Sequence, residues 1–294
     1  NWVKIWAFTG AKKSHCIKIT KNHAVLTPEG WVQAGNLTTK SLIAVSSATF
    51  TKEQEQVLIG SLLGKGGIKS RISKKGIASC PYYTEFHNIS QLGYANWKAS
   101  SFSNLSATIK EGKLENNKII ILKTKDCPIF LKYKKSVFIK KIREIDNLGI
   151  AVWIMDNGLL ETYNRPTKAY PVLYIHTDSF YNQDIIEEIF QRLYKVFPYD
   201  IFRIGHTLFL NFSAEDTKII LKHIKPYLIF DPKINNKKWV AKPIEKGEKN
   251  GYTFVPITKI ENYYGKKTEG CYDIEVEKNH NFIYNNVVIH NCAE

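Results

Sequence analysis

The residues with the most evident chemistry stand at the end of the chain, His290-Asn291-Cys292. An asparagine side-chain nitrogen can attack its own main-chain carbonyl, which closes a succinimide ring and breaks the bond to the next residue. A preceding imidazole can polarise that carbonyl or protonate the departing amine, because its ordinary pKa lies near neutrality. The Cys292 thiol can hold an acyl group as a thioester. A frayed polar terminus is the alternative interpretation, so the elements that would position these residues decide between the two.

Two stretches predict such elements. The alternation of Tyr272, Ile274 and Val276 is typical of a strand, and Asn285-Asn286 indicates a hairpin turn between two further short strands. Such a hairpin would bring Asp273 and His280 back towards Asn291. A second segment lies near the start, where Thr20 and His23 precede the sequence Val-Leu-Thr-Pro-Glu-Gly-Trp at 25–31.

Together these motifs resemble those of an intein, the self-excising element whose horseshoe-shaped β fold is called the Hint fold. Residues 20–31 resemble the second N-terminal motif of the family, 272–282 its penultimate motif, and 288–291 its terminal motif. The resemblance covers about 1–48 and 250–291, and it makes residues 292–294 the first of the downstream host segment, the extein. Nothing in that tripeptide identifies the host protein.

The resemblance also implies roles. Asn291 would cyclise with His290 as its partner, and Cys292 would be the downstream nucleophile. The supporting residues would assist cyclisation, tune Cys292 and strain the upstream scissile peptide; they are His280, Asp273, Thr20 and His23. Their side chains suit these tasks, since a hydroxyl can stabilise an oxyanion and an imidazole can transfer a proton.

The family's first step needs a Cys or Ser at the intein's first position, and Asn1 is neither. Three explanations fit: the chain is the C-terminal piece of a split intein, its N-terminus was removed, or its splicing function has decayed. The first is favoured, and it predicts an N-terminal intein fragment as a partner, together with flanking extein sequences.

Composition bounds the remaining possibilities. The chain has 294 residues, 44% of them hydrophobic, and no apolar run approaches a membrane span of about 20 residues. Five cysteines without CxxC spacing argue against a disulfide framework or a zinc site and favour a reducing, cytoplasmic compartment. The net charge of +15 indicates a polyanionic partner such as nucleic acid, with a lysine-rich proteome as the alternative.

The middle of the chain, 53–240, has its own pattern. Two helical stretches, 53–64 and 145–158, are each followed by strands and further helices, which predicts an internally duplicated α/β domain. Residues 58–66 and 150–158 are similar to the paired signature helices of LAGLIDADG homing endonucleases. In that family an acidic residue near the end of each helix holds a divalent metal over a scissile phosphate.

Both acidic positions differ here, because Lys65 and Asn157 stand in their place. Mg²⁺ prefers carboxylate oxygens and cleavage with two metals needs both sites, so we predict no metal ligands and a nuclease without activity. Asp156 is adjacent, but successive helical residues point about 100° apart. The domain could still bind double-stranded DNA at the insertion site, and the basic residues expected to contact phosphate are Lys69, Arg71, Lys74 and Lys75.

The expected fold class is therefore multi-domain: an all-β horseshoe (Hint) splicing domain interrupted by an α/β LAGLIDADG domain with pseudo-two-fold symmetry. Protein splicing is the favoured function and needs no cofactor, whereas Mg²⁺ would serve only an active endonuclease. Two alternatives remain: an active site-specific homing endonuclease with vestigial splicing halves, and a DNA-binding module without catalysis.

Overall fold

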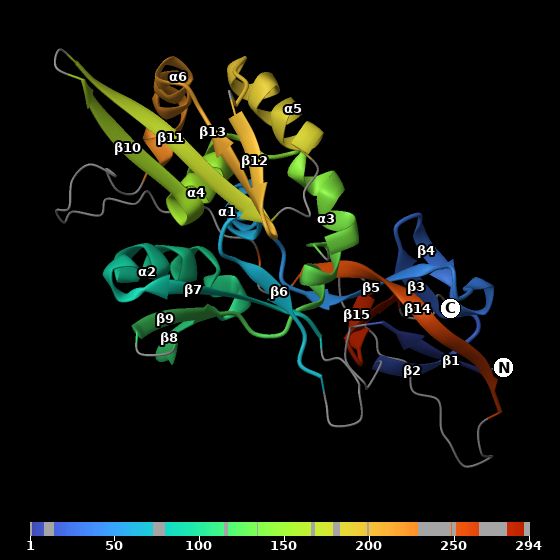
Figure 1. Cartoon of the computed structure of the whole chain (residues 1–294). Coiled ribbons are helices and arrows are strands. Elements are labelled where there is room, and N and C mark those ends of the chain that lie inside the picture. The colour runs from blue at the N-terminus through green and yellow to red at the C-terminus, as the bar shows by residue number, and fades with distance from the viewer. Residues whose placement is uncertain are drawn as a thin grey trace.

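The structure is a computed structural model that describes most of the chain. The described residues are 2–8, 15–72, 80–114, 117–133, 135–165, 168–178, 183–198, 200–228, 248, 251–264 and 281–290. An eight-stranded sheet occupies one side of the molecule, and two four-stranded sheets with their helices occupy the other (Figure 1). No helix among these residues is both long and apolar enough to cross a membrane.

The eight-stranded sheet combines strands from both ends of the chain. Its strands are β1 (Trp2–Ala7), β2 (His15–Thr20), β3 (Ala24–Thr27), β4 (Gly30–Gln33), β5 (Leu42–Ser47), β14 (Gly251–Tyr263), β15 (Asn281–Tyr284) and β16 (Val287–His290). A 3₁₀ turn, η1 (Ala34–Asn36), follows β4. The strand order is β2-β1-β14-β5-β16-β3-β4, with β15 paired to β16. β14 and β16 thus each lie between N-terminal strands, and both ends of the chain contribute to one hydrophobic core. The horseshoe shape stays a prediction.

The predicted C-terminal hairpin is confirmed. β15 and β16 pair from Tyr284↔Val287 to Asn281↔His290, and the turn residues Asn285 and Asn286 have φ angles of 46° and 67°. Positive φ at both central positions is the geometry of a tight two-residue hairpin turn, and asparagine tolerates it better than other side chains with a Cβ.

The segment between β5 and β14 repeats one arrangement twice. The first half holds α1 (Lys52–Leu63), β6 (Gly67–Lys69), β7 (Tyr82–Asn88), α2 (Leu92–Ser101), β8 (Thr108–Leu114), β9 (Asn117–Lys123) and α3 (Lys135–Ile142). The second holds α4 (Asn147–Asn157), β10 (Gly158–Arg165), β11 (Lys168–Asp178), α5 (Gln183–Tyr194), β12 (Asp200–Ile204), β13 (Thr207–Asn211) and α6 (Ala214–Ile224). The sheet orders are β6-β7-β9-β8 and β10-β11-β13-β12. This repeated order of helix, two strands, helix, two strands and helix confirms the predicted internal duplication.

Short 3₁₀ turns complete this duplicated domain. They are η2 (Ile89–Gln91), η3 (Ser103–Leu105), η4 (Pro128–Tyr133) and η5 (Lys225–Tyr227). The predicted basic strand from Ile68 to Lys75 is shorter than expected, because β6 ends at Lys69, which pairs with Tyr82 at the start of β7. Pro81 precedes Tyr82, and a proline nitrogen has no hydrogen to extend the ladder.

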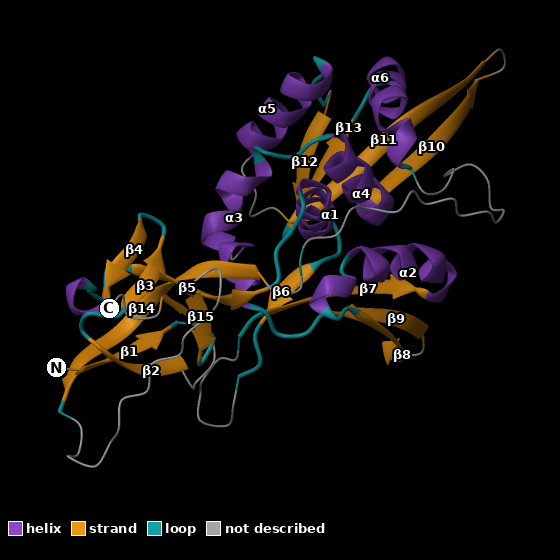
Figure 2. Ribbon diagram, turned by 180° about the vertical axis from the view of Figure 1, so that it is seen from behind, coloured by secondary structure: helices purple, strands orange, loops and turns teal. Residues whose placement is uncertain are grey.

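Helices α1 and α4 pack against each other between the two four-stranded sheets (Figure 2). Gly60 makes this approach possible, since a Cβ there would lie 2.2 Å from the Gly149 carbonyl oxygen. Gln56 of α1 also accepts from the Asp146 amide at 2.7 Å and donates to the Glu144 carbonyl at 2.9 Å. The start of α4 is therefore fixed to α1 by hydrogen bonds as well as by packing.

The two domains have separate hydrophobic cores that meet at η4. One core contains the buried residues of α1, α4 and their sheets, and the other contains those of the eight-stranded sheet. Leu131 of η4 packs against the second core, and the Ser47 hydroxyl lies 3.3 Å from the Cys127 sulfur in the buried junction. This turn therefore attaches the duplicated domain to the sheet.

Candidate functional site

The N-terminal motif forms a compact polar group before β3. The Thr20 hydroxyl lies 2.6 Å from Nδ1 of His23 and also donates to the Asn22 side-chain oxygen. His23 is 6% exposed, and its backbone carbonyl accepts from Ala34 at 2.8 Å. Thr20 and His23 are therefore held together just before β3, whereas their predicted action on the upstream scissile peptide stays a prediction.

The C-terminal motif meets the N-terminal motif through strand pairing. Ile289 of β16 pairs antiparallel with Val25 of β3, so His290 lies beside Ala24, the residue that follows His23. His290 is half-buried, and its ring contacts Trp31 of β4 at 5.1 Å between centroids. His290, which is far from Thr20 and His23 in the sequence, thus lies at the same end of β3 as they do.

The other residues of the predicted splice site lie outside the described part of the chain. They are Asp273, His280, Asn291 and Cys292. The prediction that the hairpin brings Asp273 and His280 towards Asn291 therefore stays a prediction.

A second candidate centre lies where α1 and α4 end. Lys65 follows the end of α1, is exposed, and donates to the side-chain oxygen of Gln91 at 3.4 Å. Asn157 is the last residue of α4, and its side-chain nitrogen donates to the His176 carbonyl at 3.2 Å. An ammonium offers no lone pair to a metal and an uncharged amide is a weak ligand, so these two side chains do not fit a Mg²⁺ site.

The positive charge of Lys65 influences a neighbouring side chain at this centre, His176. Partial burial, assisted by the nearby positive charge of Lys65, lowers the pKa of His176 below its usual value. The Trp153 indole nitrogen shares the His176 carbonyl with Asn157 at 3.3 Å, and Thr177 donates to the Leu63 carbonyl at 2.8 Å. Strand β11 is therefore fastened to the ends of both helices.

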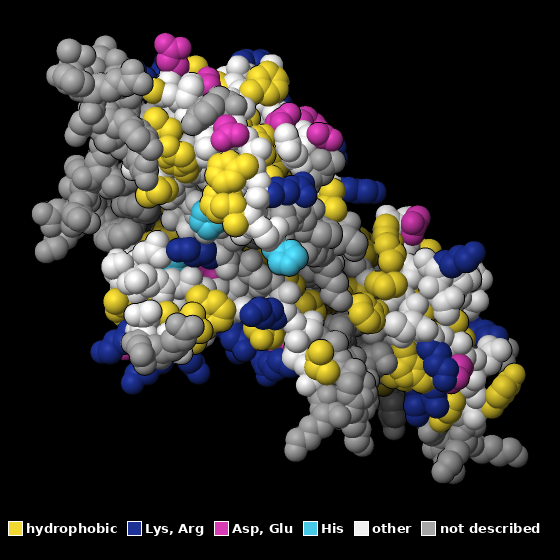
Figure 3. Space-filling model, viewed as in Figure 1, with side chains coloured by type: hydrophobic (Ala, Val, Ile, Leu, Met, Phe, Trp, Pro, Cys, Tyr) yellow, Lys and Arg dark blue, Asp and Glu magenta, His cyan; other side chains and the backbone are white. Residues whose placement is uncertain are grey.

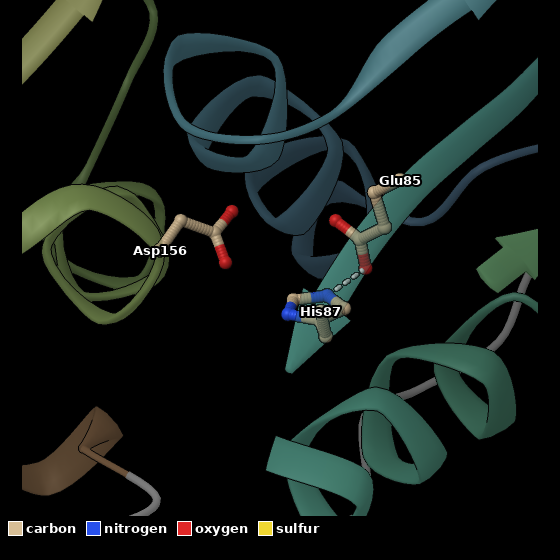
Figure 4. A group of neighbouring side chains, drawn as sticks. All are labelled: Glu85, His87 and Asp156. Carbon is tan, nitrogen blue, oxygen red and sulfur yellow. Dashed lines mark ion pairs between the residues drawn. The ribbon is translucent and has the colours of Figure 1, made fainter. Parts of the chain in front are cut away.

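Behind these helix ends lies a buried charged cluster that the sequence did not predict. The Lys98 ammonium of α2 lies 2.9 Å from Glu85 of β7 and 2.8 Å from both carboxylate oxygens of Asp156. His87 Nε2 lies 2.8 Å from Glu85, and the Tyr83 hydroxyl donates to Glu85 at 2.6 Å. Figure 4 shows Asp156 reaching from α4 towards the two side chains of β7.

The cluster joins the two halves of the duplicated domain. Among the described residues, one group of side chains could hold a metal ion, because its potential ligand atoms lie within 4.8 Å of one another. The group consists of Glu85, His87 and Asp156. However, Lys98 donates to both carboxylates and supplies the positive charge that a metal would bring. Burial alone would raise the pKa of Glu85, but Lys98, His87 and Tyr83 outweigh it and lower that pKa to about 2. Burial is also the largest influence on Asp156, and it raises the pKa of that carboxyl.

Two patterns could have revealed this cluster. Lys98 occurs on a helical face with Tyr94 and Ala95, whose spacing is that of a buried stripe. Glu85 and His87 alternate with Thr84 and Phe86, and they share the inward face of β7 with Tyr83. A single charged residue is typical of a solvated surface. Only the two patterns taken together indicate that Lys98 and Glu85 are buried and lie close to each other.

Two of the four predicted phosphate-binding residues are described, Lys69 on β6 and Arg71 just after it. Lys69 is exposed, with its ammonium 5.4 Å from the centre of the Phe86 ring. Arg71 pairs with Asp126 at 2.9 Å, which offsets part of its charge, and Lys74 and Lys75 lie outside the described residues. Further exposed lysines extend along the same sheet at Lys110, Lys113, Lys118 and Lys125. Figure 3 shows Lys and Arg side chains gathered over β8 and β9 and beside β6.

Solved structures with a similar arrangement are homing endonucleases. The homing endonuclease I-WcaI bound to its DNA recognition sequence is 19% identical, with a TM-score of 0.47 over 62% of this chain and 84% of that one. The I-LtrWI LAGLIDADG homing endonuclease bound to target DNA is 12% identical, with a TM-score of 0.43 over 61% of this chain and 86% of that one.

Curated relatives carry the name Protein RecA. The protein from Mycobacterium shimoidei is 23% identical over 304 aligned positions, which cover 94% of this chain and 69% of the relative. The protein from Mycobacterium leprae (strain TN) is 27% identical over 150 positions, covering 47% of this chain and 20% of the relative. The family model described as the intein splicing domain matches residues 9–291, from before β2 to Asn291. The chain therefore belongs to the intein splicing domain family.

Proposed function

We propose that this chain carries out the downstream half of protein splicing, in which Asn291 cyclises and Cys292 accepts the acyl group of the upstream host segment. The observation that carries the proposal is the convergence of Thr20, His23 and His290 around β3. Those residues come from the two motifs at opposite ends of the chain, and strand pairing alone brings them together.

In the proposed cyclisation, the Asn291 side-chain nitrogen forms a bond to its own main-chain carbonyl carbon and loses a proton. The bond from that carbon to the Cys292 nitrogen breaks, and the nitrogen leaves with a proton as a free amine. His290 polarises the carbonyl or transfers the proton, and His280 and Asp273 assist. Thr20 and His23 act instead on the upstream scissile peptide, where the hydroxyl and imidazole stabilise developing charge.

Complete splicing, unlike the cyclisation step alone, needs peptide partners, and we propose that it needs no cofactor. The first nucleophile is proposed to come from an N-terminal intein fragment, and flanking extein sequences are the segments that become joined. Mixing this chain with a candidate fragment and measuring ligated extein product would test that partner. Ligation that depends on the fragment is the expected result, and its absence with an active downstream junction would reject a split arrangement.

The downstream half can be tested in the chain alone. Asn291 cyclisation would release the tripeptide 292–294, which mass spectrometry of the intact chain detects as a product ending at Asn291. Asn291→Ala must abolish the release, because alanine has no side-chain nitrogen to attack. Release at an equal rate from that variant would show that an external protease cleaves the bond.

The duplicated domain supports a second function, which is DNA binding without cleavage. Its repeated topology matches the expected LAGLIDADG-like domain, whereas Lys65 and Asn157 do not fit Mg²⁺. Lys65 would contact a phosphate that the family's metal ions otherwise approach. The lysines of the first sheet would bind neighbouring phosphates, each adding to the salt dependence of affinity.

A gain-of-function pair tests this second proposal. We expect no double-strand cleavage of a plasmid carrying the insertion site, with or without Mg²⁺, although the chain retards that DNA in a gel. Replacing Lys69 and Lys110 by alanine should weaken binding and lower the salt dependence by about one unit of slope for each phosphate interaction removed. Cleavage at an ordinary rate by the unmodified chain would contradict the proposal that the domain lacks nuclease activity. Cleavage by the double variant Lys65→Asp, Asn157→Asp would show that these two positions account for the absence of activity.

A further inference from the structure

Trp31 contacts His290, although none of the proposed splicing steps gives Trp31 a role. The two ring centroids lie 5.1 Å apart with an angle of 78° between the planes, which is an edge-to-face arrangement. Trp31 is 41% exposed although it is a large aromatic residue, so burial in the hydrophobic core does not account for its position.

The sheet register produces this contact. Val25 and Ile289 pair with each other and are fully buried, so the residues next to them project from the opposite face of the sheet. His290 follows Ile289, and Leu26 follows Val25. Leu26 pairs with Trp31, which places the indole on the same face as the imidazole. The two side chains meet across the short strand β3, beside the small side chain of Ala24.

The turn before Trp31 is built to hold that register. Gly30 has a φ of +110°, a backbone conformation that side chains with a Cβ rarely adopt. The Thr27 hydroxyl donates to the Gly30 carbonyl at 2.8 Å and accepts from the Glu29 amide at 3.3 Å. Trp31 follows Gly30 directly. The hydrogen bonds of the Thr27 hydroxyl therefore fix the backbone position from which the indole side chain projects.

We propose that Trp31 is a positioning residue for the downstream splice junction, which acts by restricting the rotation of the His290 ring. The inference rests on the proposed function, in which His290 assists Asn291. A cyclisation step depends on the orientation of the assisting group, since small displacements of a catalytic group reduce rates strongly. The indole packs against the imidazole at 78° to its plane, and this contact limits the rotation of the His290 ring.

The experiment measures the rate of tripeptide release from the full chain by mass spectrometry. We expect Trp31→Leu to slow release about two- to ten-fold, which is the change in rate that corresponds to the free energy of one aromatic pair. Trp31→Phe should restore most of the rate, because phenylalanine keeps an aromatic ring at this position. Tyr252→Leu is the matched control. Tyr252 is an exposed aromatic residue of the same sheet, and it makes an edge-to-face contact with Phe254 at 5.6 Å instead of with a histidine.

Two further measurements separate positioning from a general effect on folding. In a His290→Ala background, Trp31→Leu should cause no additional slowing, because the indole would act only through the imidazole. The proton resonances of the His290 ring should also shift in Trp31→Leu and stay in place in Tyr252→Leu, since an aromatic ring shifts nearby nuclei. Additive slowing, or equal slowing by both leucine variants, would overturn the inference.

The outcomes also distinguish failure of this inference from failure of the proposed function. If neither the unmodified chain nor any variant releases the tripeptide, the proposed cyclisation is wrong and the role of Trp31 falls with it. If release occurs and depends on Asn291 and His290 but not on Trp31, only the positioning role is wrong.

Discussion

The eight-stranded sheet and the duplicated domain differ in how their scaffold relates to their chemistry. In the sheet, Thr20 and His23 match the family motif and contact each other at 2.6 Å. In the duplicated domain, the helix pair and repeated strand order match the expected scaffold, whereas Lys65 and Asn157 replace the expected carboxylates. The eight-stranded sheet thus carries side chains of the expected motif. The duplicated domain has the expected fold but lacks the expected acidic side chains.

The fold of the duplicated domain depends on buried contacts that are separate from the expected reactive positions. Gly60 and the Lys98 cluster determine how α1, α2 and α4 pack, and neither needs a carboxylate at position 65 or 157. Positions 65 and 157 take no part in these buried contacts, so their side chains can differ from carboxylates without disturbing the core.

The largest effect is expected from Lys98→Met. This change removes the ammonium from between Glu85 and Asp156 and leaves two buried carboxylates without their counter-charge. Breaking a buried ion pair in this way should lower the free energy of unfolding by about 3–5 kcal/mol, as measured by urea unfolding. Lys259→Met is the control, because Lys259 pairs with Glu261 at the surface and should have a much smaller effect. Equal effects from the two variants would show that the cluster does not join the halves.

A smaller loss should follow from Gly60→Ala in α1. The added Cβ would lie 2.2 Å from the Gly149 carbonyl oxygen, so the helices must separate. Overpacking of this kind costs about 1–3 kcal/mol, and thermal unfolding would detect it. Gly67→Ala is matched, since its Cβ would meet no atom closer than 4.0 Å. Unchanged stability in Gly60→Ala would mean that the close helix approach is not required.

The acid limb of stability should depend on Glu85. Its pKa is lowered from 4.5 to about 2 in the folded chain, so the carboxylate contributes stability above pH 4.5. That contribution is lost as the pH falls from 4.5 towards 2, because over this interval the unfolded state binds a proton at Glu85 and the folded state does not. Urea midpoints across this interval should fall with pH, and Glu85→Gln should make that fall shallower. A fall of the same steepness in both proteins would assign the effect to other carboxyls.

The smallest effect is expected from Thr20→Val on downstream cleavage. Thr20 contacts His23 and Asn22, and the Thr20–His23 pair is assigned to the upstream peptide, so tripeptide release should keep its rate. The same variant should impair any reaction with an N-terminal fragment, and Thr20→Ser should preserve it. Slowing of release as large as that of His290→Ala would show that the two junctions share one catalytic centre.

Much of this organisation could be predicted from the sequence because it is local. The Asn285-Asn286 turn, the helices α1 and α4 and the internal duplication follow from turn residues, periodicity and repeated order. The pairing of Thr20 with His23 follows from their spacing at a turn. Each of these signals depends on a few neighbouring residues, which a pattern can capture.

The remainder depends on contacts between distant segments. The cluster around Lys98 draws from β7, α2 and α4, and a lysine or glutamate in isolation indicates a surface position. The contact between Trp31 and His290 depends on a strand register that joins opposite ends of the chain. No local pattern specifies that register, and the three-residue length of β6 likewise depends on where its partner strand begins.

The central claim is that Asn291 cleaves the chain through its own side chain. The most direct measurement is the intact mass of the large product at early times, before a terminal succinimide hydrolyses. Cyclisation predicts a product that ends at Asn291 and is lighter by one water than the product of simple hydrolysis at the same bond. A product with the full hydrolysed mass from the earliest time, or none at all, would contradict the claim.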